Sequence, residues 1–101
     1  MSSIQTAEKE AVRQEILEML SMPGADGAGE KVLRAALKKT GYELTEEEVL
    51  RQICYLQEKG LVRTEEVKNP RLGIRRTIAY ITAAGTDYLE GNGGEIPGIG
   101  G

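Results

Sequence analysis

The stretch L-T-E-E-E-V-L-R-Q-I-C-Y-L-Q-E-K-G-L-V, Leu44–Val62, decides the fold of this chain. Thr45 is a favourable helix N-cap, and Glu48, three residues later, completes the sequence pattern of a capping box. Apolar residues then recur at helical spacing, at Val49, Leu50, Ile53 and Leu56. By this spacing Gln57 shares the apolar face, and Gln52 flanks the opposite, exposed face. Gly60 interrupts the pattern just before a Leu-Val pair. The stretch therefore predicts a helix that is followed at once by a strand.

Two further helices are predicted upstream, each with an apolar face and a stop signal. The first spans about residues 7–21 and ends before Pro23-Gly24, and the second spans about residues 30–39 and ends before Gly41. We expect the first helix to bury Ala11, Val12, Ile16, Met19 and Leu20, and the second to bury Val32, Leu33, Ala36 and Leu37.

The loop between these helices, Met22–Gly29, contains three glycines and is predicted to be the most flexible internal segment. Gly24 and Gly29 have the outer spacing of a phosphate-binding loop. That loop requires Lys directly after the second glycine, however, and Glu30 stands there instead. A carboxylate would face the phosphate, so the pattern favours a plain connection between two helices.

Extended structure is predicted after Gly60. Residues 61–68 and 74–82 are rich in Val, Ile, Thr and Tyr, and the N-P-R-L-G segment between them, Asn69–Gly73, is typical of a turn. Residues 83–89 are expected to form a short closing helix with Tyr88 and Leu89 turned inward. The chain thus ends its folded part in a hairpin and a helix.

Composition predicts one small soluble domain. The 101 residues are 40% hydrophobic and 29% charged, which is enough for one modest core. We expect this domain at residues 7–90, between a flexible N-terminus, residues 1–6, and a flexible Gly-rich tail, residues 91–101. No apolar run approaches the roughly 20 residues of a membrane helix, and the start of the chain carries no leader pattern. A cytoplasmic protein without a membrane partner is therefore expected, with Cys54 as a partly buried hydrophobe.

The segments I-C-Y-L-Q-E-K-G-L-V, at Ile53–Val62, and A-Y-I-T-A-A-G-T-D-Y-L, at Ala79–Leu89, carry a family resemblance. Over about residues 7–90 the chain resembles winged helix-turn-helix regulators of the MarR, PadR and ArsR type, although Ile81 stands where Leu is commoner. It is similar more closely to small winged-helix proteins of Mu-like prophages, which have no established activity. Those proteins share the Pro-Gly loop, the Gly-Leu-Val ending of the third helix and a Val-Pro-Gly-Val tail, here Ile96–Ile99.

The resemblance implies a mainly α fold with a β-hairpin, in the α+β class. A three-helix core would carry a two-stranded wing, which is the predicted hairpin, and a short C-terminal helix. It also implies a DNA-binding transcriptional regulator or a prophage accessory DNA-binding protein, which would act as a homodimer on double-stranded DNA. No cofactor is expected.

Seven side chains are candidates for contacts with duplex DNA. Base readout would use the third-helix residues Arg51, Gln52 and Tyr55, and phosphate or minor-groove contacts would use the wing residues Lys68, Arg71, Arg75 and Arg76. The whole chain has a net charge of −3, whereas residues 60–82 carry five Lys/Arg against two Asp/Glu. Arg71, at the turn, is the foremost candidate. The alternative is that these charges only keep an exposed hairpin from aggregating.

The run Glu46, Glu47 and Glu48 weakens the case for DNA, because three carboxylates at the start of the third helix would lie near phosphates. On a purely structural interpretation, they stabilise the helix N-terminus and Glu47 pairs with Arg51. A second function therefore stays open. The chain would be a protein interaction module without DNA binding, using this acidic helix and Ile96–Ile99 as a docking peptide.

Catalysis is not expected. The sequence has no His and one Cys, so His-based triads and zinc ribbons are excluded. The three consecutive glutamates diverge around a helix and cannot converge on a substrate.

Overall fold

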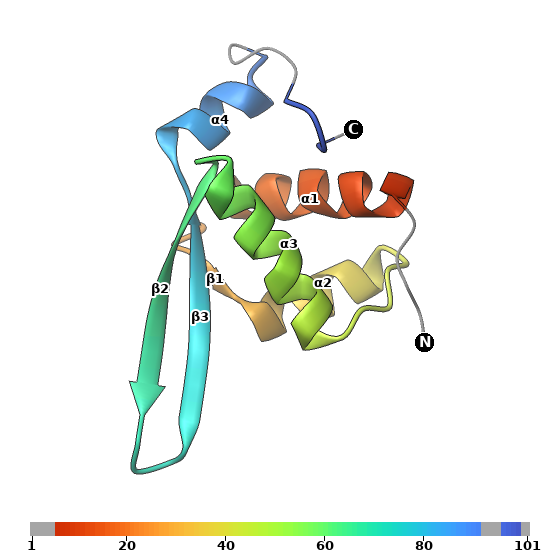
Figure 1. Ribbon diagram of the computed structural model, residues 1–101. Coiled ribbons are helices and arrows are strands. Elements are labelled where there is room, and N and C mark those ends of the chain that lie inside the picture. Colours follow the sequence, from red (N-terminus) through yellow and green to blue (C-terminus); the bar gives the residue numbers. More distant parts are fainter. Residues whose placement is uncertain (1–5, 92–95, 100–101) are drawn as a thin grey trace.

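The computed structural model describes residues 6–91 and 96–99. Of the segments predicted to be flexible, residues 1–6 and 91–101, residues 1–5, 92–95 and 100–101 lie outside the described part. Within these described residues, four helices and three strands follow one another in sequence (Figure 1). They are α1 (Thr6–Leu20), β1 (Ala28–Gly29), α2 (Glu30–Lys39), α3 (Glu46–Glu58), β2 (Val62–Asn69), β3 (Ile74–Ile81) and α4 (Ala83–Leu89). The predicted order of three helices, a hairpin and a closing helix is confirmed, and α2 and α4 have the predicted bounds.

The N-terminus of α3 is held by the capping box that the sequence predicts. The Thr45 hydroxyl accepts a hydrogen bond from the Glu48 amide at 3.1 Å, and the Glu48 carboxylate accepts one from the Thr45 amide at 2.9 Å. At the other end Gly60 adopts φ +77°, a left-handed conformation that favours glycine, and the chain turns directly into β2. The hinge from α3 into the hairpin is thus set by local sequence.

In the part of the chain that the structure describes, the sheet has three strands, in the order β1-β3-β2, and not the two that were predicted. Ala28 and Gly29 pair with β3 opposite Ala79 and Ile78. The first residue of α2 extends this attachment, because the Glu30 carboxylate accepts a hydrogen bond from the Thr77 amide at 2.8 Å. The end of the predicted flexible loop is therefore anchored to the sheet. Glu30, whose carboxylate counts against a phosphate-binding loop in the sequence, is thus hydrogen-bonded to β3.

The core lies between α1, α2, α3 and the base of the hairpin. Its buried apolar residues are Val12, Ile16, Leu17, Leu20, Leu33, Leu37, Leu44, Val49, Ile53, Leu56, Leu61, Val62, Ala79 and Ile99. Two predictions of burial are wrong, since Val32 is 61% exposed on α2 and Cys54 is exposed on α3. Of the helices described, none combines the length and apolar character needed to cross a membrane.

The buried face of α3 is rotated relative to the predicted one. Gln57, expected on the apolar face, is exposed, whereas Gln52 is only 5% exposed. The reason is a polar partner from α1, because Arg13 Nε donates a hydrogen bond to Gln52 Oε1 at 2.8 Å. A buried amide that has such a partner costs little, so the interface of α1 and α3 tolerates it.

Candidate nucleic-acid interface

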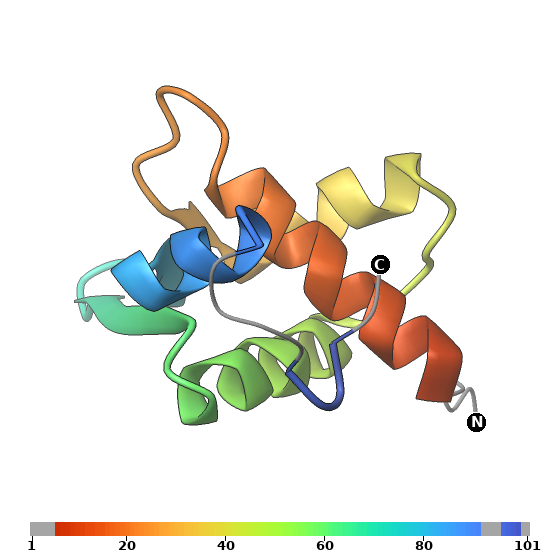
Figure 2. The ribbon, with the colours of Figure 1, turned by 90° about the horizontal axis from the view of Figure 1, so that it is seen from above.

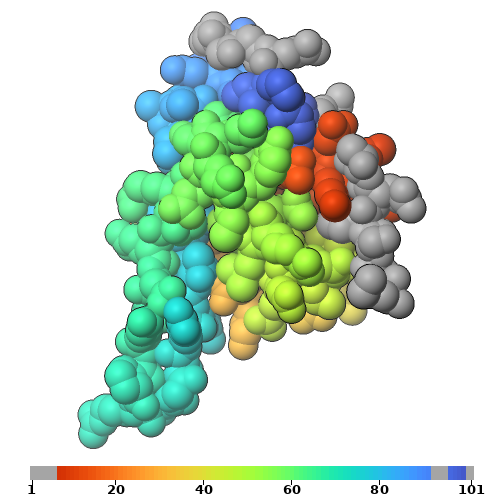
Figure 3. Space-filling model, in the orientation of Figure 1, coloured from red at the N-terminus to blue at the C-terminus, as the bar shows by residue number. Residues whose placement is uncertain are grey.

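The wing, residues 62–81, projects beyond the helices beside α3 (Figures 1 and 3). Its outer part, residues 65–76, is exposed throughout. All four predicted wing cations, Lys68, Arg71, Arg75 and Arg76, lie in this exposed part. The wing is therefore the most accessible basic element near α3.

Strand register divides these cations among three directions. Lys68 pairs with Arg75, and successive side chains of a strand point to opposite faces, so Lys68, Glu66 and Thr64 share one face. The Thr64 hydroxyl donates to Gln57 Oε1 of α3 at 3.2 Å, and hence this face is the one turned toward α3. Arg76 points to the opposite face, and Arg71 sits in the turn.

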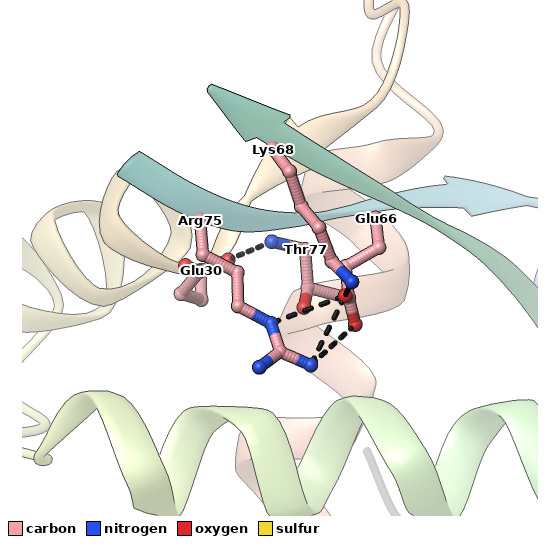
Figure 4. A network of polar contacts seen from close by, with 5 residues as sticks. All are labelled: Glu30, Glu66, Lys68, Arg75 and Thr77. Atoms are coloured by element: carbon pink, nitrogen blue, oxygen red, sulfur yellow. Dashed lines mark hydrogen bonds and ion pairs between the residues drawn. The ribbon is translucent and has the colours of Figure 1, made fainter. Parts of the chain in front are cut away.

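One carboxylate holds the two cations on the α3 side (Figure 4). Glu66 accepts hydrogen bonds from Arg75 Nε at 3.1 Å and Arg75 Nη2 at 3.2 Å, and Lys68 Nζ lies 3.2 Å from Glu66 Oε1. The hydrogen bonds from Arg75, and then that from Lys68, lower the pKa of Glu66 from its usual value of 4.5. Glu66 is thus ionised at neutral pH. It competes with any external anion for both cations.

Arg71 and Arg76 are differently placed. Within residues 6–91 and 96–99, neither guanidinium forms an ion pair with a carboxylate. Arg76 stands opposite Val67, which is 48% exposed. These two arginines can meet a phosphate without first leaving a partner in the described part of the chain.

On α3 the three predicted base-reading residues do not act together. Arg51 is exposed and its Nη2 lies 3.8 Å from Glu47 Oε1, which confirms the predicted i, i+4 pair. Gln52 is buried against Arg13. Tyr55 is half-buried, because the Arg13 guanidinium lies 3.6 Å from its ring centroid and its hydroxyl donates to the Pro97 carbonyl at 3.1 Å. Of the three, Arg51 is the exposed residue.

The acidic start of α3 is less available than its sequence suggests. Glu48 is 8% exposed and occupied in the capping box. Glu46 Oε2 lies 3.9 Å from Arg34 Nη1, and the same arginine donates from Nε to the Leu44 carbonyl at 2.7 Å. Arg34 therefore holds the turn between α2 and α3 in place, and its positive charge offsets the negative charge of Glu46. Glu47, beside Arg51, is the residue of the run that stays most exposed.

Sequence reasoning missed two residues that organise this surface. Glu66 is visible in the sequence as an acid two positions before Lys68, on the same face of a predicted strand. Arg13 lies beside Val12 in the first amphipathic helix, and a cation so close to an apolar stripe is a weak signal of a buried partner.

One small pocket lies on the surface of the described residues beside α2. A pocket lined by Arg34, Lys38, Glu43 and Leu44 has a volume of about 80 Å³, well below the several hundred Å³ of typical ligand sites. In residues 6–91 and 96–99, no three His, Cys, Asp or Glu side chains gather as a metal site would require.

Two solved structures share the arrangement of helices and strands. A PadR-like transcription factor from Bacteroides fragilis superposes with a TM-score of 0.70 at 19% sequence identity, over 83% of this chain and 78% of that one. A putative transcriptional regulator from Thermoplasma acidophilum superposes with a TM-score of 0.72 at 22% identity, over 86% and 79%. The chain has a winged-helix fold. No protein-family model matches its sequence, and no curated protein does.

Proposed function

We propose that this winged-helix protein binds double-stranded DNA and acts as a transcriptional regulator. One observation carries the proposal, the exposed wing with four cations beside α3. The likeness to a PadR-like transcription factor and to a putative transcriptional regulator supports it at the level of fold. Such a regulator works in the bacterial cytoplasm. A prophage accessory role rests only on the sequence resemblance, which is carried by the Pro23-Gly24 loop, the Gly60-Leu61-Val62 ending of the third helix and the Ile96–Ile99 tail.

In the proposed complex the wing supplies most of the affinity. Arg71, at the turn, contacts phosphate or enters the minor groove, and Arg76 contacts the backbone from the outer face. Lys68 and Arg75 join them when phosphates replace Glu66 as their partner. Arg51 is the residue of α3 that can reach a base edge, for example in a bidentate contact with guanine. Gln52 and Tyr55 are now assigned to packing between α1, α3 and Pro97.

The test is the affinity for random and operon-upstream duplexes, measured by fluorescence anisotropy across a salt series. Wild type is expected to bind at low salt with a steep salt dependence, because counterions leave the DNA as cations bind phosphates. Arg71→Ala and the double variant Arg75→Ala/Arg76→Ala should bind more weakly, each lost phosphate contact lowering the salt slope by about 1.

Lys39→Ala is the matched control. It removes one cation at the exposed end of α2, away from the wing, and should leave both affinity and slope close to wild type. Absence of binding at low salt, or wing variants that behave as Lys39→Ala does, would overturn the proposal.

A second candidate function is protein binding through the wing. Three apolar side chains are exposed at its outer end, Val67, Leu72 and Ile74, at 48%, 68% and 36%. Exposed apolar groups gathered on one element favour a protein contact, either with another protein or with a second copy in a homodimer. The sedimentation coefficient of wild type compared with Leu72→Ser tests this candidate. If wild type and Leu72→Ser both sediment as monomers at every concentration, the proposed homodimer is excluded.

A further inference from the structure

The segment Ile96–Ile99 packs against the domain, although the sequence predicted that all of residues 91–101 would be a mobile tail. Ile99 is 8% exposed and belongs to the hydrophobic core, and Ile96 is half-buried against that core. Figures 2 and 3 show the segment, in dark blue, beside α3 and α1. The segment thus lies between α1 and α3, against a site formed by Arg13, Gln52 and Tyr55, which we call the groove.

The segment is a preformed turn. The Ile99 amide donates to the Ile96 carbonyl at 3.3 Å, Pro97 follows Ile96, and Gly98 has φ +88°. Pro at the second position and a left-handed Gly at the third are the requirements of a type II β-turn. Because the sequence itself favours this shape, little conformational entropy is lost when the turn binds.

The two middle carbonyls of the turn are read by two side chains of the groove. Tyr55 on α3 donates its hydroxyl to the Pro97 carbonyl at 3.1 Å. Arg13 on α1 donates from Nη1 to the Gly98 carbonyl at 2.7 Å. With the internal bond to Ile96, three successive carbonyls of the segment have partners.

Arg13 is itself positioned before it meets the tail. Its guanidinium stacks on the Tyr55 ring, 3.6 Å from the centroid, and its Nε donates to Gln52, which is 95% buried. This fixed geometry leaves Nη1 aimed at the carbonyl of the turn. All three groove residues come from α1 and α3, so recognition of the turn does not depend on the chain that connects it to α4.

The groove also selects against a side chain at the third position. A Cβ atom added to Gly98 would collide with the Tyr55 hydroxyl and lie 2.7 Å from its Cζ. The positive φ of Gly98 disfavours any other residue independently. The site therefore recognises a sequence of four residues: an aliphatic residue, Pro, Gly and a second aliphatic residue, whose side chain enters the core.

We propose that the groove between α1 and α3 is a peptide-binding site for an aliphatic-Pro-Gly-aliphatic turn, and that it takes this turn from its own chain or from a second copy. A second copy is the partner because it carries all four recognised residues. The tail of the same chain is present at a high effective concentration and fills the site first. A tail can therefore bind the groove of a second copy only when that copy's own tail does not occupy the groove.

The test uses full-length variants and a labelled peptide of residues 92–101. Gly98→Ala keeps the groove intact but prevents its own tail from docking, so the labelled wild-type peptide should bind this variant at least about tenfold more tightly than it binds wild type. Ile99→Ser is a second way to empty the groove and should behave similarly. Gly91→Ala is the control, since Gly91 also has a positive φ but its added Cβ would meet nothing.

A mixing experiment extends the test to two chains. Arg13→Ala impairs the groove but keeps a wild-type tail, and Gly98→Ala has the complementary defect. Sedimentation of the mixture should reveal a heterodimer that neither variant forms alone. Equal peptide binding by wild type and Gly98→Ala, no binding to either emptied groove, or Tyr55 ring resonances unchanged by Gly98→Ala would each overturn the proposal.

Discussion

Replacing Glu66 by Gln should strengthen DNA binding and make it more sensitive to salt. The carboxylate engages Arg75 through three nitrogen–oxygen contacts of 3.0 to 3.2 Å and Lys68 through one of 3.2 Å. In wild type, Glu66 competes with phosphate for these two cations and suppresses their contacts with DNA. The neutral amide keeps the shape of the side chain and removes that competition.

The size of the effect follows from the number of cations that are released. Each additional phosphate contact steepens the dependence of log K on log salt by about 0.9. Over a fourfold rise in salt, one contact therefore corresponds to about a 3.5-fold loss of affinity, and two to about 12-fold. If Lys68 and Arg75 both gain phosphate contacts, Glu66→Gln should lose about 12-fold more affinity than wild type between about 50 and 200 mM salt.

Anisotropy titrations of wild type and Glu66→Gln against one duplex at four salt concentrations measure this difference. Glu65→Gln is the matched control. Glu65 is the neighbouring acid but points to the face away from α3, where it contacts Arg63 and Tyr80. Weaker DNA binding by Glu66→Gln, or a dependence of log K on log salt equal to that of wild type, would refute the competition between Glu66 and phosphate. Glu66 would then serve to hold Arg75 in its binding geometry.

Three predictions concern stability and can be checked by chemical or thermal unfolding. Thr45→Ala removes the N-cap of α3 and should lower the free energy of unfolding by about 1 kcal/mol, with no change expected if the cap is dispensable. Gly85→Ala should destabilise the protein, because the new Cβ would collide with the Leu61 carbonyl. This collision should outweigh the higher helix propensity of Ala, which is worth about 1 kcal/mol. A stabilised variant would contradict this prediction. Desolvation and the hydrogen bond to Glu65 raise the pKa of Tyr80 above its usual 10.0. The contribution of Tyr80 to stability is therefore present below pH 10 and is lost as the pH rises above it. Tyr80→Phe should reduce this loss of stability at alkaline pH.

The helices and the hairpin were predictable because their signals are local. The Thr45 and Glu48 capping box, the glycine stops and the turn at Asn69–Gly73 each act over a few residues, and the structure has all of them. Strand β1 was not predictable, since two residues carry no periodicity and pair with β3 about 50 positions later.

The surface of α3 was less predictable, because its burial depends on distant partners. Helical periodicity placed Gln52 at the flank of the exposed face, but Arg13, 39 positions earlier, satisfies its amide and allows it to be buried. The docked tail could have been recognised in part. Pro97-Gly98 between two isoleucines is the pattern of a type II turn, and the mobile-tail interpretation gave weight only to the glycines around it.

Nuclear magnetic resonance of the isotope-labelled full chain, titrated with a duplex at low salt, tests the central claim most directly. If the wing and α3 form the DNA surface, the backbone amide shifts should concentrate in residues 66–76 and around Arg51, and should leave the end of α2 near Lys39 unchanged. Shifts confined to α2, or a wing whose resonances do not move while DNA binds, would contradict the account.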